Sequence, residues 1–197
     1  MNTTAITDAI HELERCSCAE VVVEIRARSG SYAHADARFA SLLAFVALLV
    51  LLFSPWPFAP GWVAIDVAVV WILAIFIRSD SARRLMTASR ERDTQVRVLA
   101  ASVFHDRGVA NTSEEVGVLV YLSVMERRIE ILADRGVLEA VPVLEWNRLV
   151  AEARGSDATP EKLADVVRAL TPLLERHLPV REGDVDELCN VPRFITE

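Results

Sequence analysis

Two long apolar runs dominate the pattern of hydrophobic and polar positions. Residues 39–53 and 62–77 are apolar almost throughout, and Asp66 is the single charge between positions 39 and 77. A turn rich in proline and aromatic residues, 54–61, separates the two runs. Neither run has the polar face that a surface helix of a small soluble domain needs. The pattern therefore predicts a helical hairpin that crosses a membrane, and a buried hairpin in a soluble core is the alternative.

The arms of this hairpin are short for a membrane span. They hold 15 and 16 residues, whereas a straight crossing of the hydrocarbon core takes about 20. Extending the first arm through Trp56 and Phe58, and the second by Gly61, brings each near that length. Tryptophan is enriched at the membrane interface, which favours a position of Trp56 near the end of the span. Asp66 then lies one turn inside the second arm, where we expect either solvation at the interface or a contact with an ion or partner.

Arginine predicts the orientation of the hairpin. The turn between the arms has no charge, whereas nine arginines lie within about 20 residues of the outer ends: Arg26, Arg28, Arg38, Arg78, Arg83, Arg84, Arg90, Arg92 and Arg97. Positively charged flanks stay on the cytoplasmic side of a membrane. We therefore expect a multi-pass protein of the cell (inner) membrane with both termini in the cytoplasm.

Outside the hairpin the periodicity alternates between helix and strand. The predicted helices cover residues 4–15, 81–106, 143–152 and 159–177. The predicted strands cover residues 19–27, 117–124 and 129–133. The long helix 81–106 carries a clear apolar stripe from Val96 to Phe104. The residues after position 177 have no period, which predicts an extended, partly disordered end.

This order of elements predicts a small mixed-sheet α/β sandwich with an inserted two-helix transmembrane hairpin. A strand, a helical crossover and a second strand favour a parallel pair, and the last two strands read as a β-hairpin. The predicted division is residues 1–36 and 79–180 for the two parts of the α/β domain, 37–78 for the hairpin and 181–197 for an extended tail.

Charge is unevenly distributed along the chain, whose net charge is −7. Residues 78–108 hold seven arginines and four acids, a net +3, and residues 109–197 hold ten basic residues and seventeen acids, a net −7. A basic stretch beside a membrane segment is typical of contact with anionic lipid head groups. The acidic remainder argues against nucleic acid as a partner.

The three cysteines do not form a zinc motif. Cys16, Cys18 and Cys189 lack the paired spacing of a four-ligand site. Reduced, packed thiols are expected in a cytoplasmic domain, and a metal held with His11 or Cys189 is the alternative. The chain also lacks a nucleophile elbow, a phosphate loop, a dinucleotide fingerprint and a zinc-protease helix. No catalytic residue is therefore predicted.

The strands and their connections resemble the TPM domain family. The resemblance rests on residues 112–136, which contain the Gly117-Val-Leu strand and an arginine-containing turn, on the strand Ala19-Glu-Val-Val-Val-Glu-Ile25, and on Trp146 in a later helix. It implies an α/β sandwich with a small mixed sheet, and either phosphatase activity with divalent metal or an accessory role in membrane complexes. Many members have Asp or Asn directly before the Gly-Val-Leu strand, whereas this chain has Val116 there.

Three carboxylates form the candidate metal site. Glu20, Glu115 and Asp134 lie at predicted strand ends, where α/β sheets commonly place ligands, and Glu145 is a further acid that remains as a candidate. Several carboxylate oxygens would suit Ca²⁺ or Mg²⁺. The alternative is that these acids are solvated strand ends, helix caps and partners of the arginines Arg127, Arg128 and Arg135.

Two functions are compatible with these observations. The first is an integral membrane accessory or scaffold protein whose cytoplasmic domain binds a membrane or cytoplasmic protein partner, or assembles as a homo-oligomer. The alternative is a divalent-metal-dependent phosphatase. Neither the partner nor the substrate can be read from the chain.

Overall fold

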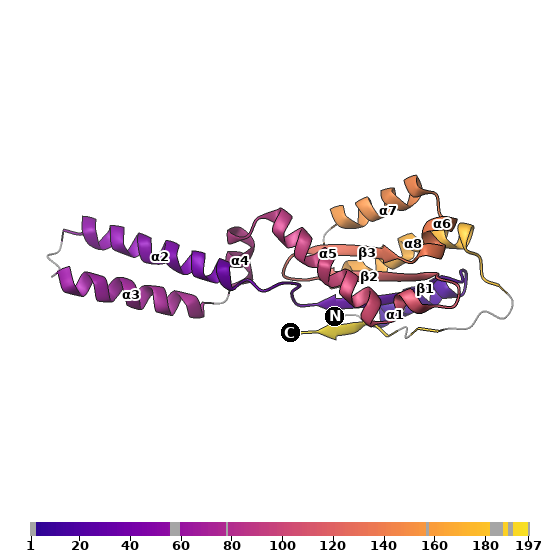
Figure 1. Ribbon diagram of the computed structural model, residues 1–197, viewed down its shortest axis with the longest axis horizontal. Coiled ribbons are helices and arrows are strands. Elements are labelled where there is room, and N and C mark those ends of the chain that lie inside the picture. The colour runs from indigo at the N-terminus through magenta and orange to yellow at the C-terminus, as the bar shows by residue number, and fades with distance from the viewer. Residues whose placement is uncertain are drawn as a thin grey trace. The chain divides into compact units, whose positions relative to one another are not determined.

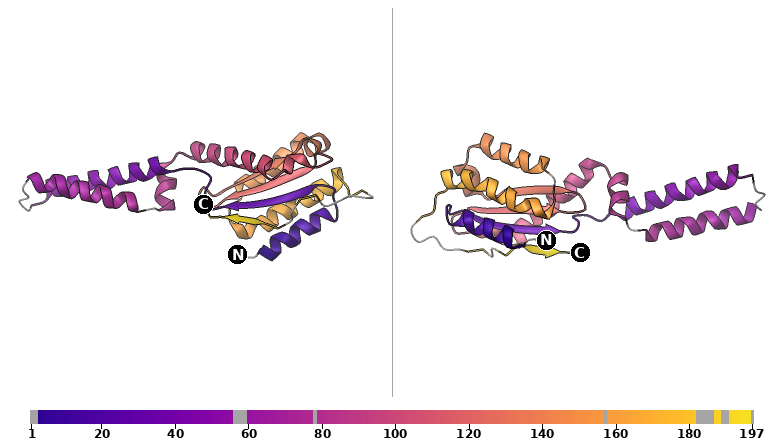
Figure 2. Two further views of the ribbon diagram at one scale, coloured as in Figure 1. Left: turned by 60° about the horizontal axis from the view of Figure 1, so that its bottom comes forward. Right: turned by 180° about the vertical axis from the view of Figure 1, so that it is seen from behind.

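The computed structural model describes residues 3–55, 60–77, 79–156, 158–181, 187–188 and 191–196. The chain divides into two compact units, which we call the α/β unit (Met1–Ser29 with Asp93–Glu197) and the hairpin unit (Gly30–Arg92). Figures 1 and 2 show the elements of both units. The hairpin unit is wider than the hairpin 37–78 that the sequence suggests, because the segments on both sides of the apolar arms pack with them.

The α/β unit has four strands and a series of helices. Its strands are β1 (Glu20–Arg26), β2 (Gly117–Ser123), β3 (Arg128–Ala133) and β4 (Arg193–Ile195). Its α-helices are α1 (Thr3–Glu14), most of α5 (Ser89–Asp106), α6 (Arg135–Ala140), α7 (Val143–Gly155) and α8 (Leu163–His177). Two short 3₁₀ helices, η1 (Val109–Asn111) and η2 (Pro160–Lys162), precede β2 and α8.

The sheet is mixed, with strand order β3-β2-β1-β4. Strand β1 runs parallel to both β2 and β4, and β2 pairs antiparallel with β3. The predicted parallel pair and β-hairpin are both confirmed. Strand β1 is central in the sheet, since it has a neighbour on each side.

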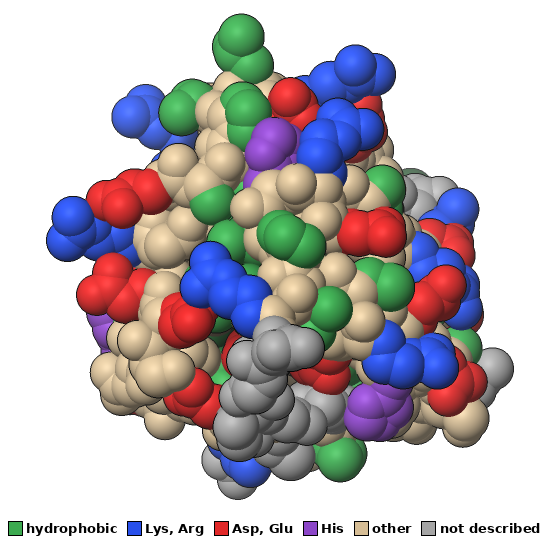
Figure 3. Space-filling model, turned by 90° about the vertical axis from the view of Figure 1, so that its right-hand side faces the viewer, with side chains coloured by type: hydrophobic (Ala, Val, Ile, Leu, Met, Phe, Trp, Pro, Cys, Tyr) green, Lys and Arg blue, Asp and Glu red, His purple; other side chains and the backbone are tan. Residues whose placement is uncertain are grey.

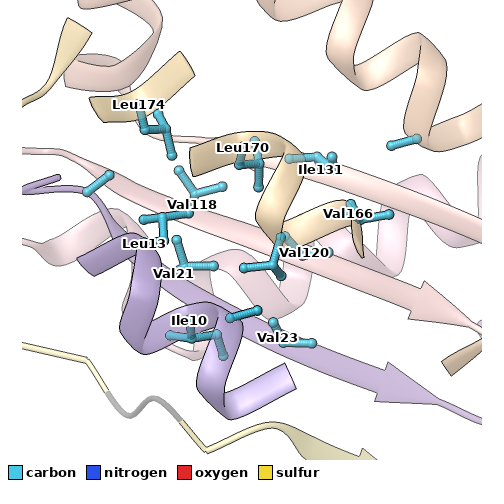
Figure 4. Packing of buried hydrophobic residues seen from close by; sticks show 14 of the residues in the cluster. Ile10, Leu13, Val21, Val23, Val118, Val120, Ile131, Val166, Leu170 and Leu174 are labelled. Carbon is cyan, nitrogen blue, oxygen red and sulfur yellow. The ribbon is translucent and has the colours of Figure 1, made fainter. Parts of the chain in front are cut away.

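Helices cover both faces of the sheet. On one face, α1, α7 and α8 pack on the odd-numbered residues of β1 and the even-numbered residues of β2, and Figure 4 shows this core. On the other face, α5 contacts Val22, Leu119 and Tyr121. The expected mixed α/β class is therefore confirmed. Alternation of side chains across a strand explains the arrangement, because it sends successive residues to opposite faces.

The expected single helix over residues 81–106 is wrong. The structure has α4 (Asp80–Met86), a break at Thr87 and Ala88, and then α5. Thr87 is 3% exposed and adopts an extended backbone (φ −114°, ψ 129°). The two residues after it restart the helix, since the Ala88 carbonyl accepts the amides of Glu91 and Arg92. The apolar stripe that the sequence indicates belongs to α5 alone.

Two elements of the C-terminal half are not indicated by the sequence. Residues 134–136 begin helix α6, because the Asp134 side chain accepts the Arg135 amide at 2.7 Å as a helix cap. The predicted tail contributes strand β4, whose residues Arg193 to Ile195 pair with Glu24 to Arg26. A three-residue strand is too short to show a periodic pattern, and its pairing partner, β1, lies far away in sequence.

The hairpin unit consists mainly of α2 (Ala33–Phe53) and α3 (Pro60–Phe76), followed by α4. Figures 1 and 2 show α2 and α3 side by side in every view, and the Trp71 indole donates to the Ser41 hydroxyl at 3.2 Å between them. Among the described residues, one helix, α2 with 21 residues, is by itself long and apolar enough to cross a membrane. The chain bends by 107° between α3 and α4.

Candidate functional site

The three predicted metal ligands lie at one edge of the sheet. Glu20 pairs with Gly117 at the start of the parallel strands β1 and β2, and the amide of Asp134, after β3, donates to the Gly117 carbonyl at 2.8 Å. The carbonyl of Glu115, two residues before Gly117, accepts the Gly136 amide at 2.8 Å. The structure therefore brings the backbones of all three acids together, at the amino ends of the parallel strands.

Their side chains nevertheless serve separate local roles. Glu20 is 7% exposed and accepts the Leu188 amide at 3.3 Å. Glu115 is exposed and has a left-handed backbone (φ 57°) in the turn before β2. Asp134 caps α6 with Oδ1, while its buried Oδ2 has no hydrogen-bond partner in the described part of the chain.

The implied Ca²⁺ or Mg²⁺ site does not fit these side chains. Nowhere in the described ranges do three His, Cys, Asp or Glu side chains cluster closely enough to hold a metal ion. One carboxylate is a helix cap, and another binds a backbone amide. The general preference for ligand sites in α/β sheets concerns the carboxyl ends of parallel strands, and these acids lie at the amino ends.

A row of polar residues crosses the sheet near its other edge, on the face that α5 covers. The register aligns Glu24 of β1 with Tyr121 of β2 and Tyr121 with Glu130 of β3. The next row, one pleat further on, contains Arg26, Ser123 and Arg128. We call these six residues the polar rows. They lie toward the carboxyl ends of the parallel strands β1 and β2.

Each glutamate of the polar rows lies between two arginines. Glu24, whose side chain is 1% exposed, accepts from Nε of Arg26 at 2.7 Å and from Nε of Arg107 at 2.8 Å. A buried carboxylate is stable only when it is paired and hydrogen-bonded. Arg107 directly follows α5, so this pair fixes the end of that helix on the sheet.

Glu130 repeats the arrangement at the edge of the sheet. Its side chain is 8% exposed and forms a two-pronged contact with Arg154 at the end of α7, including Nε to Oε2 at 3.1 Å. A second arginine, Arg97 of α5, lies 3.7 Å away. Three elements that are separate in sequence therefore meet at this carboxylate.

A second hydrogen-bond network ties the exit of β1 to the turn between β2 and β3. The Ser29 amide donates to the buried Glu126 carboxylate at 2.8 Å, and its hydroxyl lies 2.8 Å from the Tyr121 hydroxyl. Ser123 also donates to Glu126. Burial raises the pKa of Tyr121 to about 12, because the low-dielectric interior disfavours the charged phenolate. This network anchors the chain where it leaves the α/β unit.

An open cavity of about 360 Å³ lies beside Glu130. Its walls come from α5, β3 and the end of α7, and they contain both charged and apolar side chains. The lining residues are Asp93, Val96, Arg97, Arg128, Ile129, Glu130 and Arg154. We call this space the arginine cavity.

The cysteines do not form a site among the described residues. Cys18 is 3% exposed and belongs to the core on the α1 side of the sheet, and Cys16 is half-buried. The side chain of His11, their suggested companion, is 55% exposed and lies 3.9 Å from Glu14. Cys189 lies outside the described residues.

The hairpin unit carries most of the exposed large apolar side chains of the described chain. The side chains of α2 and α3 point outward along most of their length, and Phe45, Phe53 and Phe76 are 56%, 84% and 75% exposed. Asp66 is also exposed, on the first half of α3. At the start of α2, Asp36 forms a two-pronged ion pair with the buried Arg83 of α4, with both contacts at 2.8 Å.

The sequence indicates only part of these arrangements. A glutamate in an otherwise apolar strand indicates a buried charge that needs a partner. Glu24 and Glu130 interrupt apolar strands in this way, and Glu126 lies in the turn between two of them. The arginines that pair with them come from α5, α7 and the segment after α5, at no fixed spacing. Sequence reasoning therefore missed the polar rows and the arginine cavity.

Comparison with known proteins supports the fold. The chain matches no protein-family model and no curated protein. It is similar to the NMR structure of the BA42 protein from the psychrophilic bacterium Bizionia argentinensis, with a TM-score of 0.53 and 17% sequence identity over 98% of this chain and 92% of that chain. At this level of identity the likeness concerns the fold alone.

Proposed function

We propose that this chain is an integral membrane accessory or scaffold protein. In this proposal α2 and α3 lie in the lipid bilayer of the cell (inner) membrane, and both termini are cytoplasmic. The α/β unit then binds a protein partner, or another copy of the chain, at the membrane surface. The exposed apolar surface of the hairpin unit is the observation that carries the proposal.

The size of that surface favours lipid as its environment. Soluble monomers rarely expose a contiguous apolar patch larger than a few hundred Å². Nine large apolar side chains of α2 and α3 are at least half exposed: Phe45, Val50, Leu52, Phe53, Trp62, Ile65, Ile72, Leu73 and Phe76. Ile77, directly after α3, is half exposed as well. Both segments are α-helices, whose backbone groups pair within the helix except at its ends, as a bilayer requires.

The charges of the hairpin unit agree with this orientation. Its arginines lie in the segments before and after the apolar arms, and the described part of its turn is uncharged. Arginine near the ends of short loops stays on the cytoplasmic side during insertion. The bend of 107° between α3 and α4 would let α4 follow the membrane surface while α3 enters the bilayer.

Membrane insertion can be tested with one substitution and a matched control. Phe45→Arg places a charge in the middle of α2, which costs about 3 kcal/mol in insertion experiments. Leu144→Arg changes a residue of α7 that is even more exposed, at 84%. We expect the first variant to lose resistance to alkaline extraction from membranes and the second to keep it. Equal extraction of the two variants and the wild type would contradict the proposal.

The accessory role is tested by the composition of the purified particle. Native mass measurement in an uncharged detergent is expected to find a homo-oligomer or a second protein. A strict monomer that purifies alone would count against the scaffold role and would leave membrane insertion unaffected.

The metal-dependent phosphatase stays the second hypothesis. It rests on the TPM resemblance and on the buried Oδ2 of Asp134, which has no hydrogen-bond partner among the described residues. Against it, Glu20, Glu115 and Asp134 do not cluster as metal ligands. The test is hydrolysis of a generic phosphate ester with Mg²⁺ or Ca²⁺ added. Activity that survives Glu115→Ala and Asp134→Ala would remove the suggested site, and absence of activity would remove the hypothesis.

A further inference from the structure

The arginine cavity gathers three guanidinium groups from three elements. Arg97 comes from α5, Arg128 from β3 and Arg154 from the end of α7, and all three line the same space of about 360 Å³. Their side chains are 63%, 32% and 43% exposed. They are therefore accessible to solvent, although acidic side chains of the cavity also contact them.

Two acids hold these arginines in place without neutralising them. Asp93 accepts from Nε of Arg128 at 2.6 Å, and Glu130 accepts from Nε and Nη2 of Arg154. Three positive and two negative groups leave the cavity with a net charge of +1. A partly enclosed cavity with a surplus of guanidinium groups attracts anions.

Donors remain on two of the arginines after these contacts. Arg97 lies 3.7 Å from Glu130, which is too long for a hydrogen bond, so its planar fork is available. Arg154 uses Nε and Nη2 on Glu130, so the second terminal nitrogen can still donate. Guanidinium forks match the oxygens of phosphate, because one group can bind two oxygens at once.

We propose that the arginine cavity binds the phosphate group of a phosphomonoester. Donors that approach from two elements, α5 and α7, suit a tetrahedral group, whose oxygens point in several directions, better than a flat carboxylate. The group can come from a soluble phosphate compound or from a lipid head group. The site is independent of the proposed role of the hairpin, since every lining residue belongs to the α/β unit.

The test uses the full chain in an uncharged detergent. Isothermal titration with inorganic phosphate, at constant ionic strength, compares the wild type with Arg97→Gln. We expect Arg97→Gln to bind phosphate roughly tenfold to hundredfold more weakly, because it loses one or two hydrogen bonds to a charged group. Arg97 is the suitable position, because Glu130 keeps its closer partner Arg154 and no buried acid is left unpaired.

Arg148→Gln is the matched control. Arg148 is an exposed arginine of α7 that pairs with Glu152 at 2.9 Å and does not line the cavity. We expect its phosphate affinity to equal that of the wild type within about twofold, as for a residue without shared partners. The proposal is overturned if the wild type shows no phosphate binding, or if Arg97→Gln and Arg148→Gln have the same effect.

Two lipid compositions distinguish the sources of the phosphate group. The chain is placed in nanodiscs of phosphatidylcholine alone, or of phosphatidylcholine with phosphatidic acid, and titrated again with phosphate. If a lipid head group is the ligand, phosphatidic acid suppresses phosphate binding in the wild type. If a soluble compound is the ligand, the affinity is the same in both nanodiscs. Either result supports the site, provided that Arg97→Gln weakens binding in phosphatidylcholine.

Discussion

At the residue scale, buried polar side chains set the local constraints of the α/β unit. Glu24 and Glu126 are both 0% exposed, and each accepts hydrogen bonds from partners that are distant in sequence. A buried carboxylate without such partners would cost several kcal/mol. Each of these acids is therefore stable only when its hydrogen-bond partners are in place. The partner of Glu126 is Ser29, where the chain leaves the α/β unit.

Glycine 117 provides the sharpest test of packing. A Cβ at this position would lie 2.1 Å from the Val109 carbonyl oxygen, whereas nothing lies within 4 Å of a Cβ at Gly155. We expect Gly117→Ala to destabilise the unit by about 3 kcal/mol or more, because η1 and β2 must separate. Gly155→Ala is expected to be neutral or to stabilise by about 0.5 kcal/mol. Thermal melts followed by circular dichroism measure both, and similar melts for the two variants would refute the packing argument.

Ionisation of Tyr121 is expected to lower the stability of the α/β unit at high pH. Its pKa is raised from 10.0 to about 12 by burial. Between these pH values the unfolded chain releases the phenolic proton and the folded chain keeps it, so the free energy of unfolding falls as pH rises. Two pH units correspond to about 3 kcal/mol at most. The stabilising effect is fully present below pH 10.

Tyr121→Phe is the control for this prediction. The variant cannot ionise at this position, and Ser29 keeps Ser123 as a hydrogen-bond partner at 2.6 Å. Its stability curve should be flatter than that of the wild type over this range, and the tyrosinate absorbance that appears near pH 12 should be reduced. Parallel curves for the two proteins would show that another group causes the alkaline effect.

At the scale of elements, an ion pair fixes α4 against the beginning of α2. The side chains of Arg83 and Asp36 are 8% and 15% exposed, so loss of the Asp36 charge leaves the buried Arg83 with the longer contact to Asp80, at 3.6 Å. Breaking a fully buried pair costs about 3 kcal/mol or more, and the remaining contact to Asp80 reduces that cost. Asp36→Asn should therefore loosen α4 without altering the apolar helices.

The matched variant for this contact is Arg84→Gln. Arg84 neighbours Arg83, but its side chain is bonded within α4 to Ser81 at 3.2 Å. Hydrogen exchange of the α4 amides should increase in Asp36→Asn and remain as in the wild type in Arg84→Gln. Equal protection in both variants would mean that the helix is held by its backbone contacts and not by the ion pair.

On the scale of the whole molecule, the hairpin unit is an insertion into a domain with its own core. The chain leaves the α/β unit at Ser29, which binds Glu126, and returns at Asp93, which binds Arg128 at 2.6 Å. Glu126 and Arg128 are two residues apart, so the two ends lie close together. Figure 3 shows basic and acidic side chains interspersed on one face of this unit, with scattered hydrophobic ones. Such a surface is compatible with solubility.

Replacement of residues 30–92 by a Gly/Ser loop of about ten residues should therefore leave a folded α/β domain. Loop length itself costs little, about 0.6 kcal/mol per doubling. We expect a product that no longer enters membranes and gives a cooperative melt by far-ultraviolet circular dichroism. The same replacement combined with Gly117→Ala is the negative control. An unfolded or aggregated product would show that the α/β core needs the hairpin unit.

Local patterns of the sequence account for most elements of the fold. Alternating residues of β1 and the stripe of α5 predict which faces are buried, because strand and helix periods act over a few residues. The break at Thr87, the helix α6 and the three-residue strand β4 were not predicted. Each depends on contacts that no period records: burial of one side chain, a cap by Asp134, or a partner strand about 170 residues away.

The sequence by itself determined the two apolar arms, the mixed α/β composition and the parallel crossover between β1 and β2. Only the tertiary structure decided which charged residues lie close together. It assigned Glu20, Glu115 and Asp134 to the amino edge of the sheet, each with a separate local role. It also brought Arg97, Arg128 and Arg154 to one cavity. The physical reason is that strand direction, register and helix packing are long-range properties, and the spacing of charges along a chain does not encode them.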